Sequence, residues 1–161
     1  MKEKLLIHAV NEAYSFAPEQ IVCIEADGNY CNFYLLSNGN SYLLSYQLGQ
    51  IESIIKEQLS YSSYSFVRVG KSLIVNADEV LCVNVTKQTL EMNTTSGEKL
   101  LFSASREALK KLMSFLVENR KNGIVRSINN MHSAPSKSMA LLRGHHQATM
   151  PDDDIRVICN G

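Results

Sequence analysis

Short apolar runs separated by turn-forming residues recur along most of the chain, and this alternation limits the folds open to it. It is typical of antiparallel strands, because strands are short and Gly, Asn and Ser favour the turns between them. The runs predict strands near residues 4–8, 13–17, 21–25, 30–36, 41–45, 66–69, 73–75, 80–86, 89–92 and 99–103. A mainly β fold of short antiparallel sheets follows.

Two segments carry the strongest turn chemistry. Asp27-Gly28-Asn29 predicts a tight turn, because Gly and Asn tolerate positive φ. Ser37-Asn38-Gly39-Asn40 predicts a hairpin, because Asn-Gly suits a type I′ turn. We expect the last expected strands, within residues 80–103, to form an antiparallel meander.

Helical periodicity appears in two places. Near residues 47–58, apolar residues recur at spacings of three and four, which indicates an amphipathic helix. Its apolar residues are Leu48, Ile51, Ile54, Ile55 and Leu59, and the polar residues between them are Gln50, Glu52, Lys56 and Glu57. A second helix is expected near residues 105–118, with Ser103 or Ser105 as its N-cap.

The composition excludes several classes of protein. The 16 basic and 16 acidic residues cancel, so a broad electrostatic grip on nucleic acid is not expected, and any contact must come from a few local basic groups. No apolar run is long enough for a membrane span and the start does not resemble a signal peptide, so a cytoplasmic protein without membrane insertion is expected. No residues are arranged as a nucleophile with its base, which argues against an enzyme.

The four cysteines form no C-x-x-C pair and no metal-ligand spacing with histidine, so we expect reduced, partly buried thiols and no metal or cofactor. The apolar pattern weakens after residue 119. We therefore divide the chain into a folded domain at residues 1–119 and a tail at residues 120–161 that is largely disordered or loosely docked. The tail contains His145-His146, for which a solvated role is expected.

The segment FVRVGKSLIVN at residues 66–76 predicts two strands with a break at Gly70-Lys71-Ser72. Glycine relaxes the backbone there, and Lys71 would point to solvent. A lysine beside a serine on a loop can meet a phosphate or a guanine edge, although from the residue alone an ordinary solvated lysine is the more common case. The break is not a phosphate-binding P-loop, because the upstream glycine and the following helix are missing.

Three segments of the chain resemble the LytTR family of DNA-binding domains. FVRVGKSLIVNADEV is similar to the family signature. IVCIEADGNYCNFYLLSNGNSYLLSYQLGQIE is similar to the family's first half, and LLFSASREALKKL to its last strand, Ser-Arg loop and terminal helix. Together these matches cover about residues 4–118, in the family's order and spacing.

The resemblance implies an elongated fold of short antiparallel β-sheets with small helices, in which loops enter successive major grooves of DNA. Matched by position, Asn29 and Tyr30 lie in the first contact loop. Lys71 and Ser72 lie in the second loop. Ser105 and Arg106 lie in the third, just after the last strand.

The chemistry of these residues supports the implied roles to different degrees. Arg106 has a planar fork that can hold a guanine edge or a phosphate, whereas Lys71 acts as a point charge. The hydroxyls of the two serines suit phosphate contacts. Asn29 fits either an adenine edge or a turn, and Tyr30 fits either a contact or a scaffold role.

The other polar residue of the signature strand, Arg68, fits an ion pair with Glu25 or another carboxylate within the scaffold.

The signature has one departure from the family. Gly70 stands where the family usually has His, and Lys71 where Arg is frequent, so lower affinity or a changed sequence preference is expected. Only a short segment precedes the first matching strand, so a stand-alone regulator without a receiver domain is expected.

The expected function is sequence-specific binding of double-stranded DNA in transcription regulation, on paired repeat sites, with a homodimer or a regulatory protein as further partner. The alternative is an interaction module that kept the fold and lost DNA binding.

Overall fold

A computed structural model describes residues 3–37, 41–60, 64–128 and 155–159. Their strands form three antiparallel sheets, accompanied by two α-helices. The strands are β1 (Leu5–His8), β2 (Ala13–Phe16), β3 (Ile21–Asp27), β4 (Tyr30–Leu35), β5 (Ser41–Leu44), β6 (Phe66–Val69), β7 (Leu73–Asn76), β8 (Val80–Asn84), β9 (Thr89–Met92), β10 (Leu100–Ser103) and β11 (Arg156–Cys159). The helices are α1 (Leu48–Leu59) and α2 (Arg106–Ile128), and the 3-10 turns are η1 (Pro18–Gln20) and η2 (Ala77–Glu79).

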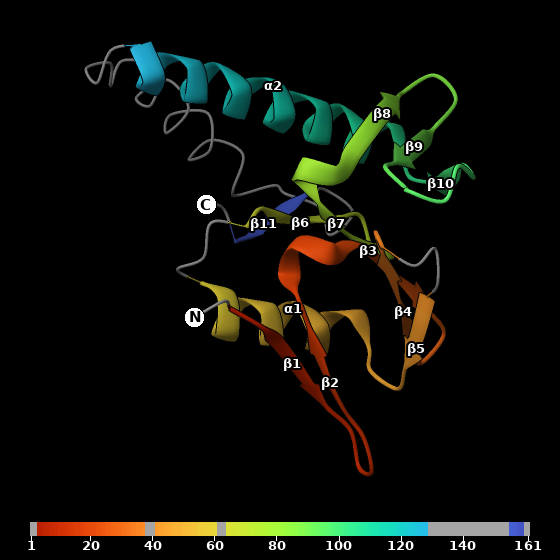
Figure 1. Ribbon diagram of the computed structural model, residues 1–161. Helices are drawn as coiled ribbons and strands as arrows, with labels where there is room; N and C mark the ends of the chain where they lie inside the picture. Colours follow the sequence, from red (N-terminus) through yellow and green to blue (C-terminus); the bar gives the residue numbers. More distant parts are fainter. Residues whose placement is uncertain (1–2, 38–40, 61–63, 129–154, 160–161) are drawn as a thin grey trace, which may run out of the picture.

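A six-stranded sheet in the order β11-β6-β7-β3-β4-β5 forms the middle layer. Helix α1 and the β1–β2 hairpin cover one face of it, while α2 and the three-stranded sheet β10-β9-β8 lie on the other side (Figure 1). Alternate residues of the sheet strands point to opposite faces, and buried apolar residues lie on both, so both faces of the middle layer need a cover.

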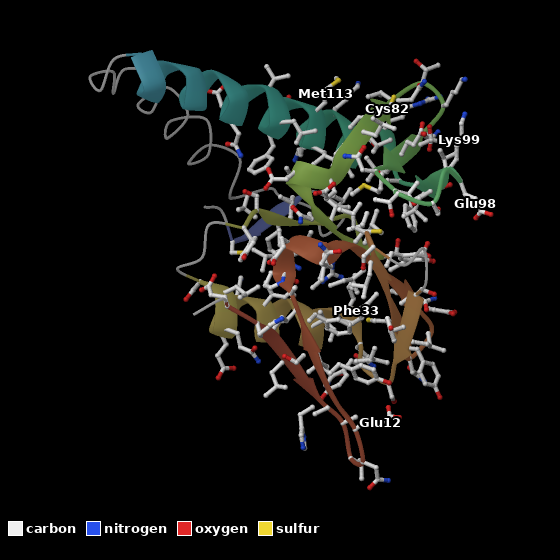
Figure 2. The ribbon with its side chains drawn as sticks, in the orientation of Figure 1. Glu12, Phe33, Cys82, Glu98, Lys99 and Met113 are labelled. Carbon is white, nitrogen blue, oxygen red and sulfur yellow. The ribbon has the colours of Figure 1, made fainter. Side chains whose placement is uncertain are left out.

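The core on the α1 side joins the hairpin, the helix and one face of the sheet. Its fully buried residues include Ile7 from β1, Ile55 from α1 and Phe33 from β4. Phe33 points between the sheet and α1 (Figure 2), where its ring stacks on that of Phe16 with centroids 4.9 Å apart. This packing secures the hairpin, which as an isolated two-stranded unit would be only marginally stable.

The core on the α2 side is separate. Val67 and Val75 from the sheet meet Leu90 and Phe102 from the three-stranded sheet and Leu109 from α2. The rings of Tyr34 and Phe102 meet edge to face, with centroids 5.2 Å apart, which ties β4 to β10. The helix that carries Arg106 is therefore anchored on the same sheet as the two turns expected to contact DNA.

The structure confirms the expected mainly β fold with antiparallel sheets and two helices. The meander within residues 80–103 is present as β8, β9 and β10. The second helix starts where expected but continues to Ile128 rather than ending near residue 118. Strands β4 and β5 pair as a hairpin, but its Asn38-Gly39 turn lies outside the described residues.

The described part of the C-terminal segment contains a strand that the sequence pattern did not predict. Strand β11 pairs with β6 at the edge of the six-stranded sheet, with Arg156 opposite Arg68. Residues 129–154, including His145-His146, lie outside the described residues. The domain boundary at residue 119 stays a prediction.

All four cysteines are free thiols; Cys23, Cys31 and Cys159 are buried and Cys82 is exposed. Burial raises the pKa of Cys31 to about 11, and the nearby Arg68 guanidinium partly opposes the rise. A protonated, buried thiol is a weak nucleophile, so Cys31 acts as a core residue. Across the residues that the structure describes, none of the helices is long and apolar enough to cross a membrane.

Candidate nucleic-acid interface

The turns expected to carry the first two contact loops lie side by side at one end of the six-stranded sheet. Strand β3 pairs with both β4 and β7, and Glu25 lies opposite Leu73. One residue further on, the Ala26 amide donates to the Ser72 carbonyl over 2.8 Å. This pairing therefore brings the turn at residues 70–72 to the end of β3, next to the turn that carries Asn29.

The first turn joins Asp27 directly to Tyr30 through only two residues. Gly28 has φ of 60°, whereas Asn29 has a negative φ. A glycine with positive φ at the first of two central positions is the pattern of a type II′ hairpin turn. The possibility that Asn29 serves the turn through positive φ is therefore wrong, because Gly28 alone adopts that conformation.

The exposed side chains of the first turn are free to contact a ligand. Asn29 makes no hydrogen bond within the described residues, and its side chain is exposed. Tyr30 is 47% exposed, so it does not belong to the core. Asp27 is exposed as well and places a carboxylate at the same end of the sheet.

The second turn, Gly70-Lys71-Ser72, connects Val69 to its partner Leu73. Gly70 has φ of 66°, a conformation that costs a residue with a Cβ atom about 1–2 kcal/mol. Lys71 and Ser72 are exposed, and Lys71 has no ion-pair partner in the described part of the chain. The second turn therefore offers a free ammonium beside a free hydroxyl.

The third expected loop lies between β10 and α2. The Ser105 hydroxyl accepts a hydrogen bond of 3.1 Å from the Ala108 amide, so Ser105 is the helix N-cap. Its hydroxyl hydrogen remains available to a phosphate. Arg106 begins the helix, is exposed, and makes no ion pair with any of the described residues.

The six expected contact residues thus fall into two groups. Asn29, Tyr30, Lys71 and Ser72 share one end of the six-stranded sheet. The other two are at the start of α2, whose buried residues Ala108 and Leu109 belong to the same core cluster as Val69 and Leu73, the residues that flank the second turn. The core thereby links the third loop to the second turn, although no direct contact joins Arg106 to Lys71.

Arg68 pairs with a carboxylate of the scaffold, as expected, but the partner is Glu52 rather than Glu25. Its Nη1 atom is 2.8 Å from Glu52 Oε1, while Glu25 instead accepts a hydrogen bond from the Tyr34 hydroxyl. Glu52 was expected among the polar residues between the apolar positions of α1, but it is buried and faces the sheet. An arginine in the middle of a buried strand needs a carboxylate partner. The arginine within the apolar FVRV segment was therefore the sequence signal that could have pointed to a carboxylate on the facing helix.

Asn76, the last residue of the signature, has a structural role. Its side-chain amide donates to the Ile21 carbonyl over 3.1 Å, and its oxygen accepts from the Asp78 amide over 3.1 Å. Asn76 is buried, and both bonds satisfy backbone groups where β7 ends and η2 begins. It therefore aligns β7 with β3, the pairing that brings the two turns together.

Comparison with known proteins identifies one family. The family model described as "LytTr DNA-binding domain" matches residues 11–116. No curated protein matches the chain. Among solved structures, a LytTr DNA-binding domain from Bacillus cereus is 16% identical, covers 73% of this chain and 98% of its own, and superimposes with a TM-score of 0.47.

The match to the family model spans strands β2 to β10, all of α1 and the first turns of α2, and it therefore includes both turns at the end of the sheet and the loop before α2. Domains of this family are DNA-binding regulatory modules rather than enzymes. The chain belongs to the LytTr DNA-binding domain family, and its partner is DNA in the regulation of transcription.

Proposed function

We propose that this protein binds duplex DNA sequence-specifically by placing the turn at Gly28–Asn29, the turn at residues 70–72 and the loop before α2 in the major groove. The observation that carries the proposal is the arrangement of the first two turns. They project from one end of the same sheet, and Asn29 and Lys71 are exposed there without partners among the described residues.

The three loops suit different parts of a DNA site. Asn29 has the paired donor and acceptor that match an adenine edge. Arg106 can hold a guanine edge or clamp a phosphate with two parallel bonds, whereas Lys71 acts as a point charge. The hydroxyls of Ser72 and Ser105 fit phosphate oxygens and would fix the register of the protein on the duplex.

The charge of the protein limits the number of phosphates that it can neutralise. The formal net charge is zero, so only the few basic groups near the loops neutralise phosphates. The logarithm of affinity should fall with the logarithm of salt concentration with a slope of about two to five for one domain. A homodimer on paired repeats, which we expect, would add the slopes of its two domains. Because the partner is DNA, we expect the protein to act in the cytoplasm, with a regulatory protein as a further partner.

The experiment that tests the proposal is selection of bound sequences from random duplex DNA, followed by titration of the selected duplex at several salt concentrations. We expect one enriched sequence, bound in a salt-sensitive manner. The double variant Lys71→Ala, Arg106→Ala should lose most of this binding while keeping the unfolding midpoint of the wild type. Absence of any enriched sequence would count against the proposal.

A second candidate function is an interaction module without DNA binding. Two observations favour it: the exposed Asp27 carboxylate at the same end of the sheet as Lys71, and Gly70 in place of the family's usual histidine. This candidate predicts that the double variant regulates its target genes in cells as well as the wild type does. Loss of regulation in the double variant would exclude it.

A further inference from the structure

The Arg68 guanidinium holds the backbone of the second turn. Its Nε atom donates to the Gly70 carbonyl over 3.2 Å, and its Nη2 atom donates to the Lys71 carbonyl over 2.9 Å. Its Nη1 atom donates to Glu52 Oε1 over 2.8 Å. The side chain of Arg68 is only 13% exposed, so it lies beneath the turn rather than beside it. One planar group therefore ties two carbonyls of the turn to helix α1.

The Glu52 carboxylate is shared with a second arginine from the C-terminal strand. Arg156 Nε lies 2.7 Å from Glu52 Oε2, and Arg156 Nη2 lies 2.9 Å from Oε1. The Glu52 side chain is 8% exposed, whereas that of Arg156 is 53% exposed. Oε1 thus accepts from both arginines, and Oε2 is held by Arg156.

The geometry of the strands makes this sharing necessary. Arg68 and Arg156 are directly opposite each other in the β6–β11 ladder. Like charges placed opposite each other on adjacent strands destabilise the pairing. The carboxylate between them removes that repulsion, and its bonds to Arg156 fix its orientation towards Arg68. The direction of the Arg68 guanidinium, and with it the turn, depends on all three residues.

We propose that Glu52, Arg68 and Arg156 form a positioning triad that sets the conformation of the turn at residues 70–72, so that the C-terminal strand controls DNA affinity without touching DNA. The effect on affinity rests on the proposed function, because it acts through Lys71 and Ser72. The effect on the turn itself does not, and it can be measured in the free protein.

The test uses the full chain with Arg156→Gln, chosen because Arg156 is half exposed and its replacement leaves the Arg68–Glu52 pair in place. Affinity for the selected duplex should fall roughly 3- to 10-fold, the loss expected when a charge-assisted bond that orders a binding group is removed. The salt slope should stay that of the wild type, because no phosphate contact is lost. In the free protein, the amide signals of residues 70–72 should shift and their hydrogen exchange should accelerate.

Two further variants sharpen the readout. Arg68→Lys should reproduce the amide changes. A single ammonium cannot replace the planar guanidinium, whose separate N–H groups reach two carbonyls and a carboxylate at once. Gln58→Ala is the matched control: it removes the bonds of 2.8 and 2.9 Å between α1 and the Leu6 backbone, at a site without contact to the triad. It should lower stability without changing the amide signals of residues 70–72 or the affinity.

The proposal is overturned if Arg156→Gln leaves the amide signals of residues 70–72 unchanged, or if it reduces the salt slope as Lys71→Ala does, because Arg156 would then be a phosphate contact. If the wild-type protein binds no duplex, the proposed function fails. The triad is then judged by the amide signals and exchange rates alone.

Discussion

The turn between β3 and β4 and the turn between β6 and β7 lie at the same end of one sheet, but they are held in different ways. The first has two residues, and its shape follows from Gly28 and from the pairing of Asp27 with Tyr30. The second has three residues, and its carbonyls are held by Arg68. The comparison shows that the first turn is shaped by its own residues, while the second is held by Arg68, which shares the Glu52 carboxylate of α1 with Arg156 of β11.

The largest effect is expected from removing the support of the second turn. Arg68→Ala leaves the buried Glu52 carboxylate with Arg156 alone, and the free energy of unfolding should fall by about 3 kcal/mol. Urea unfolding measures the loss. Lys71→Ala, in the same turn but exposed, should change the free energy of unfolding by less than about 0.5 kcal/mol. Equal losses in the two variants would show that Arg68 gives the turn no special support.

The two turns should differ in how they contribute to DNA binding. Asn29→Ala should cost roughly 1–3 kcal/mol of discrimination at one base pair, because it removes a paired contact to a base edge. Lys71→Ala should weaken binding to all sequences alike and lower the salt slope by about one, because it removes a phosphate contact. Titration of single-base variants of the selected duplex at two salt concentrations separates these effects. A loss of discrimination at one base pair in Lys71→Ala would reverse the assignment.

The local origin of the first turn can be tested by adding one methyl group. Gly28 has φ of 60° and open space where a Cβ atom would lie, so Gly28→Ala should cost about 1–2 kcal/mol through backbone strain alone. The matched control is Gly49→Ala, also in open space but inside α1. It should stabilise the protein by about 0.5–1 kcal/mol, since Ala is the better helix former. Thermal unfolding of both variants measures these changes in stability. A Gly28→Ala variant as stable as the wild type would contradict the turn assignment.

The smallest effect is expected from the carboxylate between the two turns. Asp27 is exposed and ends β3 at the same end of the sheet as the turn that carries Lys71, so its carboxylate repels phosphate there. Asp27→Asn should raise DNA affinity about two- to fivefold, the range for one surface charge in water. The gain should shrink at high salt because of screening. Reduced affinity would instead indicate that the Asp27 carboxylate accepts a bond from a base.

Much of the fold was predictable because its signals are local. Alternating and 3.6-residue periodicities located the strands up to residue 103 and both helices, since these patterns reflect which side of an element meets the core. The Asp27–Asn29 turn was predictable for the same reason. The choice between Gly28 and Asn29 as the residue with positive φ was not, because the sequence allows both residues that conformation.

The residues of the candidate site were predictable only where the sequence resembles the motifs of a known family. The residues on its loops were named from the order of three motifs, and the assignment of the six contact residues remains a prediction. The support beneath the second turn was not foreseen. Glu52 was interpreted as one of the polar residues between the apolar positions. Its spacing of four residues from Leu48 and three from Ile55 nevertheless puts it on the apolar face of α1, unlike the exposed Glu57.

The amino-acid sequence by itself determined the order of strands, turns and helices, and it placed Asn29, Lys71 and Arg106 next to strand or helix ends. Only the tertiary structure decided that Arg68 pairs with Glu52 and that Arg156, 104 residues further along the chain from Glu52, pairs with the same carboxylate. The physical reason is the separation in sequence over which each effect acts. Periodicity and turn preference act between near neighbours in sequence, whereas a buried charge takes whichever partner the packed elements bring within a few ångströms.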